Sequence, residues 1–249
     1  VIAEFPAATA EDVQSAIDCA QAAARGWRKT PGPERGRVLW RAADIARQRA
    51  DEIARTLTRE EGKILKEAKG EVMKGISLLE FYAGEGFRMH GKTLPSEARD
   101  TFTYTVRSPL GVVGLIAPWN FPWAIPVWKS APALAAGNCV IFKPAELTPA
   151  TATLLTEIYQ EAGLPPGVMN VVTGDAEVGR ALVEHDEIDM VSFTGGTFTG
   201  RAIAEAAARR LQAVVLELGG KSPNIIFEDA DLDRAAKTAA DGIFSGGGQ

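Results

Sequence analysis

The sequence predicts an α/β fold in which helices cover both faces of an open parallel sheet. From Gly111 onward, short apolar stretches alternate with amphipathic ones. The short stretches are apolar throughout, which is typical of parallel strands buried on both faces. Of the 249 residues, 46% are hydrophobic and 24% are charged. This composition fits a globular chain and is too apolar for a disordered one.

Charge and cysteine usage narrow the class of protein. The formal net charge of -5 argues against a nucleic-acid partner, because phosphate binding requires a basic face. No apolar run approaches the roughly 20 residues of a membrane span, so no membrane association is expected. Two cysteines in a chain of this length form no disulfide framework, which indicates a reducing compartment. Since no signal segment follows Val1, we expect a trimmed start and a cytoplasmic location.

The first hundred residues predict a layer of solvated helices. Thr9 stands three residues before Asp12, an arrangement that is typical of a helix start. Pro33 suits the first turn of a second, longer helix. Each helix carries an apolar stripe for packing and a charged face for solvent. Helices are expected over 12–25, 34–60 and 66 to about 82.

The spacing of apolar residues changes from helical to strictly alternating at residues 101–106. Threonines alternate there with Phe102, Tyr104 and Val106, which predicts a half-buried strand. A lone alternating strand must pair with another strand, either in this chain or in another subunit.

Beyond Gly111 a unit of strand and helix repeats along the chain. Thr148 and Pro149 suit the start of one of these helices, and Gly163 suits its end. Strands are expected over 112–117, 140–142, 169–172, 190–193, 214–216 and 224–227, and helices over 122–136, 149–162, 176–185, 199–210 and 232–244.

Polar residues and glycines follow the ends of successive strands. Ligands of open parallel sheets bind beyond the carboxyl ends of the strands, so these residues are expected to gather on one rim. They are Trp119 and Asn120, Lys143 and Glu146, Thr173 and Gly174, and residues 194–197 and 217–221.

Residues 193–200 join a strand to a helix through a glycine turn. Glycines let a backbone approach a phosphate, and a helix N-terminus attracts negative charge. The segment lacks the G-x-G-x-x-G spacing of a dinucleotide fingerprint. Dinucleotide binding and an ordinary strand-to-helix turn therefore both stay open.

The other rim side chains each have a functional and a structural interpretation. Lys143 and Glu146 can together bind a ribose diol, or they can form a surface ion pair of little consequence. Glu217 ends an apolar strand, where desolvation of its carboxylate would suit a general base. Alternatively, its carboxylate accepts hydrogen bonds from backbone N–H groups of the glycine turn. Asn120 can donate to an oxyanion or cap a helix.

The remaining reactive residue types indicate no further site. His90 and His185 stand in polar surroundings, and no cluster has metal-ligand spacing, so no metal is expected. Cys19 and Cys139 are interpreted as buried small residues, because free cysteine is among the most buried residue types.

Five short motifs occur in order along the chain. They are PWNFP at 118–122, KPAELTP at 143–149, FTGGTFTG at 193–200, ELGGKSP at 217–223 and GGQ at 247–249. Together they resemble the NAD(P)-dependent aldehyde dehydrogenase superfamily, specifically its N-terminal, cofactor-binding portion, and the resemblance covers essentially the whole chain. One departure is Gly196, where the family often has Ser, so one side-chain contact near the phosphates is expected to be absent.

The resemblance implies a Rossmann-like fold and a set of roles. Asn120 would stabilise the oxyanion of a thiohemiacetal, and Glu217 would activate the water that hydrolyses a thioester. Lys143 and Glu146 would hold the adenosine ribose, and the turn 195–200 would lie beside the pyrophosphate. The cofactor-binding residues that the resemblance implies are Trp119, Lys143, Glu146, Thr194, Gly195, Gly196, Thr199, Gly200 and Leu218.

The activity implied by the resemblance is oxidation of an aldehyde to a carboxylic acid, through attack by a cysteine thiolate. The family motif continues Gly-Gln-x-Cys, so the nucleophile is expected two residues past Gln249, followed by the catalytic domain. Glu217 favours hydrolysis over transfer to coenzyme A or phosphate. The carboxylate of Glu146 would repel a 2′-phosphate, so NAD is the expected cofactor, with NADP possible.

The resemblance also implies a domain division. Residues 1–98 and 109–249 would form the NAD(P)-binding domain. Residues 99–108 would be part of a small β-ribbon through which subunits associate as homodimers or homotetramers. The substrate would be a small-molecule aldehyde, with small semialdehydes as the first class to consider. The alternative is a free-standing dinucleotide-binding or inactive interaction module without catalysis.

Overall fold

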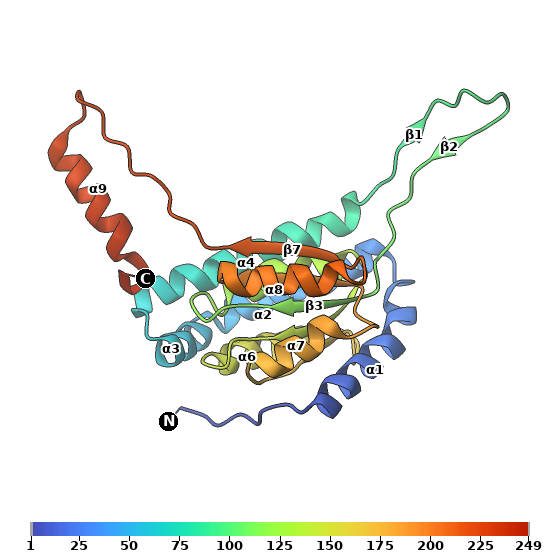
Figure 1. The fold of residues 1–249 in the computed structure, drawn as a ribbon, viewed down its shortest axis with the longest axis horizontal. Helices are drawn as coiled ribbons and strands as arrows, with labels where there is room; N and C mark the ends of the chain where they lie inside the picture. Colours follow the sequence, from blue (N-terminus) through green and yellow to red (C-terminus); the bar gives the residue numbers. More distant parts are fainter. Residues whose placement is uncertain (1, 249) are drawn as a thin grey trace.

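A five-stranded parallel sheet forms the centre of the molecule (Figure 1). The structure is a computed structural model, and it describes residues 2–248. The strands lie in the order β5-β4-β3-β6-β7, and each neighbouring pair is parallel. Their bounds are Val112–Ile116 (β3), Cys139–Lys143 (β4), Met169–Val171 (β5), Met190–Gly195 (β6) and Ala213–Leu218 (β7). The predicted α/β fold with an open parallel sheet is confirmed.

Helices cover both faces of the sheet because the chain crosses it in two directions. It first moves outward from β3 to β5 and then returns past β3 to β6. Since parallel crossovers are right-handed, the helices of the two halves fall on opposite faces. One face carries α5 (Ala124–Ala135) and α6 (Pro149–Glu161), and the other carries α7 (Ala176–Glu184), α8 (Thr197–Ala208) and α1 (Ala10–Trp27), which contacts β4 and α7.

The central strands lie in the core of the molecule. All five residues of β4 are buried, and Leu115 and Phe142 are among the largest fully buried side chains. Each apolar side chain of this size contributes roughly 1.5–3 kcal/mol on burial. Gly114 in β3 lies under α7, where a Cβ would come within 3.2 Å of Leu182. Helices packed this closely on both faces explain why these strands are apolar at every position.

A second layer of helices lies outside α5 and α6. It consists of α2 (Gly32–Gln48), α3 (Ala50–Glu61) and α4 (Leu65–Arg88), so α4 runs beyond the predicted end near Tyr82. The prediction of a single helix over 34–60 is wrong, because the chain bends at Arg49 (φ -95°, ψ 13°). The Arg49 guanidinium lies 3.7 Å and 3.4 Å from carboxylates of Glu157 and Glu161 on α6. Arg49 also donates to Glu52 in α3 at 2.8 Å, so the residue at the bend has one local partner and two on a distant helix.

The N-terminus of α6 is also capped from another element. The helix begins at Pro149 as expected, but the Thr148 side chain makes no capping hydrogen bond. Instead, the Glu60 carboxylate at the end of α3 accepts hydrogen bonds from the backbone N–H groups of Ala150 (2.5 Å) and Thr151 (3.0 Å). A carboxylate satisfies the free N–H groups of a helix start and complements its dipole. This contact joins the outer helical layer to the inner one.

The alternating segment near residue 100 forms half of a projecting hairpin (Figure 1). Its regular part is short: β1 (Thr93–Leu94) pairs with β2 (Thr103–Tyr104) in antiparallel fashion. The prediction of a half-buried strand over 101–106 is wrong, because Phe102 is 74% exposed and Val106 is 70% exposed. The described part of the chain offers no surface to cover the apolar side of this hairpin.

The C-terminal part extends away from the sheet (Figure 1). The predicted strand over 224–227 is absent, and this stretch is exposed chain without regular structure. Helix α9 (Leu232–Phe244) has the predicted bounds, but it carries no buried residue. After it, η1 (Ser245–Gly248) returns to α4, where Gly246 N–H donates to Glu67 at 3.0 Å. A strand needs neighbours for its hydrogen bonds, and none of the described segments lies beside 224–227.

Within residues 2–248, none of the helices combines the length and the apolar character that a membrane span requires.

Candidate functional site

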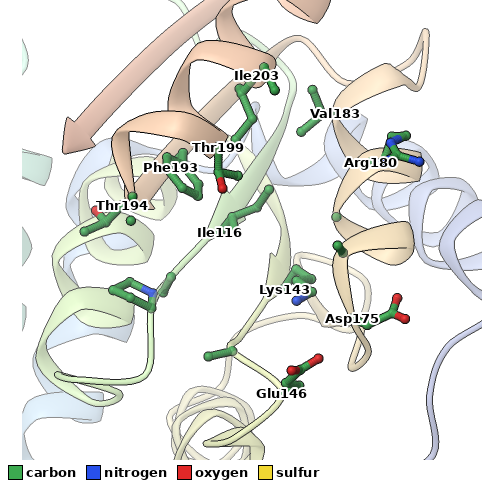
Figure 2. Close-up of a pocket in the computed structure, with 18 of the residues that line it drawn as sticks. Ile116, Lys143, Glu146, Asp175, Arg180, Val183, Phe193, Thr194, Thr199 and Ile203 are labelled. Carbon is green, nitrogen blue, oxygen red and sulfur yellow. The ribbon is translucent and has the colours of Figure 1, made fainter. Parts of the chain in front are cut away.

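A pocket of about 610 Å³ opens at the carboxyl edge of the sheet, between α7 and α8 (Figure 2). It begins where β3, β4 and β6 end, which is the place where open parallel sheets bind their ligands. Gly200 and Leu218 lie behind it, in contact with each other: a Cβ on Gly200 would come within 2.5 Å of Leu218. The predicted residues that line the pocket are Trp119, Lys143, Glu146, Thr194, Gly195, Gly196 and Thr199.

The N-terminus of α8 faces this pocket without a side-chain cap. Gly196 is the N-cap residue, and α8 has no acidic residue in its first turn. A Cβ at Gly196 would meet nothing within 4 Å, so the space in front of the helix is open. The first N–H groups of a helix lack partners within the helix and attract anions. The glycine turn therefore presents an anion site to the pocket.

Lys143 and Glu146 lie at another wall of the pocket. Lys143 ends β4 and is only 8% exposed, whereas Glu146 is exposed on the following loop. The structure shows no ion pair within 4.0 Å between them in the described part of the chain. Burial lowers the pKa of the Lys143 ammonium group, and the charges of Glu146 and Asp175 partly oppose this shift. Both polar groups are thus left free to contact a ligand.

Asn120 lies on the loop between β3 and α5, outside the pocket lining. Its Oδ1 atom is buried and has no hydrogen-bond partner among the described residues. The N-cap position of α5 is Trp123, so Asn120 is not the cap of that helix. A buried amide oxygen without a hydrogen-bond partner is unusual, so neither a helix cap nor another described contact accounts for the position of the Asn120 side chain.

A buried ion pair supports the Asn120 loop from below. The Lys63 ammonium group donates to the Glu71 carboxylate at 2.6 Å and to the backbone carbonyl oxygen of Asn120 at 2.9 Å. Glu71 in turn accepts from the backbone N–H groups of Trp123 (2.9 Å) and Ala124 (3.0 Å). Sequence analysis missed this pair. The available signal was a carboxylate at position 71 on the apolar stripe of α4, next to the buried Val72.

Glu217 faces a second cleft, of about 580 Å³, between α5 and the β6–β7 side of the sheet. The expectation that Glu217 is desolvated is wrong, because its face of β7 is uncovered and the residue is exposed. In the same cleft, the Lys129 ammonium group donates to Ser192 Oγ at 2.9 Å. Burial lowers the pKa of Lys129 to about 8, although the charge of Glu217 opposes the shift.

The two clefts meet at one residue. Thr194 lines both of them, and it is the register partner of Glu217 in the parallel pair of β6 and β7. Glu217 therefore stands one strand away from the pocket that the glycine turn faces.

Neither cysteine lines the pocket or the second cleft. Cys139 is buried in β4 as expected, and burial raises the pKa of its thiol to about 11. The expectation that Cys19 is buried is wrong, because it is exposed. Cys19 lies on the solvent side of α1, whereas its neighbours Ile17 and Ala20 face the core.

Several pocket residues were missed by sequence analysis. Asp175 directly follows the Thr173–Gly174 turn after β5, so the rule that located the other rim residues also covers it. The remaining ones, on α7 and α8, carry no signal that separates them from ordinary helix residues; they include Arg180, Val183, Phe198 and Ile203. No group of His, Cys, Asp or Glu that could hold a metal ion is present within residues 2–248.

This combination of fold and site defines a class of protein. An open parallel sheet with an uncapped helix and a glycine turn at its carboxyl edge is typical of α/β proteins that bind phosphorylated ligands there.

Comparison with known proteins identifies the family. The profile of the aldehyde dehydrogenase family matches residues 1–249. The chain is 50% identical over 242 residues to an alpha-ketoglutaric semialdehyde dehydrogenase of Bacillus subtilis (strain 168), covering 97% of this chain and 50% of that protein. The chain therefore belongs to the aldehyde dehydrogenase family, and it spans about half the length of this relative.

Solved structures agree with this assignment. An NADP-dependent enzyme of E. coli superposes with a TM-score of 0.96 at 41% identity, covering 98% of this chain and 51% of that one. PnpE in complex with nicotinamide adenine dinucleotide superposes with a TM-score of 0.96 at 38% identity, covering 100% of this chain and 51% of that one.

Proposed function

We propose that the pocket between α7 and α8 binds NAD. The observation that carries this proposal is the uncapped N-terminus of α8, which opens onto the pocket that Lys143 and Glu146 also line. The pyrophosphate would lie at this helix start, where Gly196 leaves open space. Lys143 and Glu146 would bind the adenosine ribose, and the apolar side chains of Val183 and Ile203 suit a flat base. The pocket is also lined by Trp119, Thr194 and Thr199.

NAD is proposed in preference to NADP because of Glu146. A carboxylate at the ribose diol accepts hydrogen bonds from both hydroxyls, whereas it repels a 2′-phosphate. Family membership alone leaves the choice open, since the similar proteins include both an NADP-dependent enzyme and an NAD complex.

We propose that the whole protein oxidises an aldehyde to a carboxylic acid. The bound dinucleotide would be the oxidant and would itself be reduced. The nucleophile would be a cysteine outside these 249 residues, because Cys139 is buried with a raised pKa and Cys19 lies on the outer face of α1. Attack by the thiolate converts the aldehyde carbonyl into an oxyanion. The Nδ2 group of the Asn120 amide would donate to that oxyanion.

Glu217 would act in the second half of the reaction. After oxidation the acyl group is held as a thioester, and a water must attack its carbonyl carbon. The Glu217 carboxylate would take the proton from this water. The support is its position: it pairs in register with Thr194, which lines the proposed cofactor pocket. Its exposure in this chain leaves room for substrate on the same side of β7.

A small semialdehyde is the substrate class that we propose. The support is the 50% identity to a relative that acts on alpha-ketoglutaric semialdehyde. Turnover of semialdehydes that carry a carboxylate should exceed turnover of the matched aldehydes without one.

We also propose a domain division, a mode of subunit association and a cellular location. The NAD(P)-binding domain would comprise 1–98 and 109–249, with 99–108 in an association ribbon. Apolar residues on the projecting hairpin, such as Phe102 and Val106, are exposed, which favours burial between subunits of a homodimer or homotetramer. Light scattering of the protein and of a Phe102→Ser variant tests this proposal. A cytoplasmic location fits the two unpaired cysteines.

The activity is tested with variants of the whole protein. Asn120→Ala should lower kcat by about 10²–10³-fold. Glu217→Gln should leave a rapid burst of reduced dinucleotide but slow the steady state by about 10²–10⁴-fold. The exposed carboxylate of Glu205 on α8 gives a control, and Glu205→Gln should not change turnover. Loss of the burst in Glu217→Gln would contradict the role in hydrolysis. Dinucleotide binding without aldehyde oxidation would favour a binding module without catalysis.

A further inference from the structure

The ribose end of the proposed cofactor pocket holds a second carboxylate. Asp175 lies between β5 and α7 and lines the pocket together with Lys143 and Glu146. Figure 2 shows these three side chains at one end of the pocket and Thr199 and Ile203 at the other. Asp175 is exposed to the solvent of the pocket. Its charge also acts on Lys143, as does that of Glu146.

Asp175 occupies the N-terminus of α7. It is the N-cap residue, and its Oδ1 atom accepts a hydrogen bond from the Glu177 N–H at 2.9 Å. Both α7 and α8 thus start at the pocket, and their N-termini differ in capping. The start of α8 has no capping side chain and can accept an anion. The start of α7 already holds a carboxylate, which satisfies an N–H group and offsets the positive end of the helix dipole.

The two cations that line the pocket, Lys143 and Arg180, also have carboxylate neighbours. Arg180, which lines the pocket from the second turn of α7, forms an ion pair with Glu177 at 3.0 Å. Lys143 faces the carboxylates of Glu146 and Asp175. A phosphate on the ribose would therefore meet a helix start that is already occupied and cations that already face carboxylates.

We propose that Asp175 is a specificity-determining residue that excludes dinucleotides carrying a phosphate on the adenosine ribose. This inference rests on the proposed function, because it assumes that the ribose binds at Lys143 and Glu146. Glu146 acts as an acceptor for the ribose hydroxyls, whereas Asp175 keeps the neighbouring helix start from receiving a phosphate. Removing only the charge of Asp175 should remove the repulsion of an anion at that start while the cap is kept.

The test is the ratio of the NADP dissociation constant to the NAD dissociation constant, measured by calorimetric titration of the whole protein. Asp175→Asn keeps an oxygen that can cap α7 but removes the charge, and Asp175→Ser does the same with a hydroxyl. We expect both variants to lower the ratio about tenfold at low salt, and less at high salt, because the repulsion is electrostatic.

Asp231 provides a matched control. It is the N-cap of α9 and accepts from the Arg234 N–H at 3.1 Å, but it does not line the pocket. Asp231→Asn should leave the ratio unchanged. If both Asp175 variants bind NAD and NADP with the wild-type ratio, the inference is overturned while the proposed function stands. If the wild-type protein binds neither dinucleotide, the proposed function and the inference are both overturned.

Discussion

Lys63 and Glu71 form an ion pair of 2.6 Å with side chains only 2% and 1% exposed. Their remaining hydrogen-bonding capacity goes to the backbone of the Asn120 loop and the first residues of α5. The Lys63 ammonium group also lies 4.2 Å from the ring centroid of Phe121, which adds a cation–π contact to the same loop. The pair thus connects the outer helical layer to the loop that carries the proposed oxyanion donor.

Breaking this pair should destabilise the protein. Lys63→Met leaves the Glu71 carboxylate buried without its cation, which costs about 3–5 kcal/mol in the free energy of unfolding. Urea denaturation measures this loss. The exposed pair of Lys69 and Asp51, at 2.7 Å, provides the control, and Lys69→Met should leave the unfolding midpoint unchanged. Equal effects of the two substitutions would show that burial of Lys63 does not matter.

Two glycines of α4 should respond in opposite ways to alanine. A Cβ at Gly75 would overlap the buried Trp123 indole, whereas a Cβ at Gly70 would meet nothing within 4 Å. Gly75→Ala should therefore lower stability by about 1–3 kcal/mol through overpacking. Gly70→Ala should raise it by about 0.5–1 kcal/mol, since alanine is the better helix former. Thermal denaturation of the two variants distinguishes these effects, and a stabilised Gly75→Ala variant would contradict the described packing.

The stability contribution of Lys129 should depend on pH. Its pKa is about 8 in the folded protein and 10.5 ordinarily, so the unfolded chain binds more protons between these values. Stability therefore rises with pH across this window. The free energy of unfolding of Lys129→Met minus that of wild type should therefore fall by about 3 kcal/mol between pH 7 and pH 10.5. Denaturation at both pH values tests this, with Lys237→Met as a control for removal of an exposed charge. A constant offset for Lys129→Met would rule out the shift.

The two cysteines should differ in reactivity. Cys19 is exposed, whereas Cys139 is buried in β4 with its thiol pKa raised to about 11. The thiolate is the reactive form, so iodoacetamide at neutral pH should modify Cys19 first and Cys139 only after unfolding. Peptide mapping by mass spectrometry measures both sites in one sample. Rapid modification of Cys139 in the native protein would contradict its burial.

Much of the candidate site could be predicted from the sequence because parallel strands end at one edge. Lys143 and Thr194 lie at the ends of different strands, yet both line the same pocket, as the strand pattern indicated. Asp175 obeys the same rule, since it directly follows Thr173 and Gly174 at the end of β5. The support beneath Asn120 could not be predicted, because Lys63 and Glu71 meet only when the turn between α3 and α4 is formed.

The sequence by itself determined the order of helices and strands over residues 112–218, the parallel sheet and the family, because apolar periodicity and strand-end motifs are local properties. Tertiary structure decided which of those surfaces are covered. At the bend between α2 and α3, Arg49 contacts carboxylates of α6, and the start of α6 is capped by Glu60 of α3. Phe102 and Glu217 are exposed although their patterns indicated burial. The physical reason is that periodicity records which face of an element is apolar, whereas burial requires a second element to lie against that face.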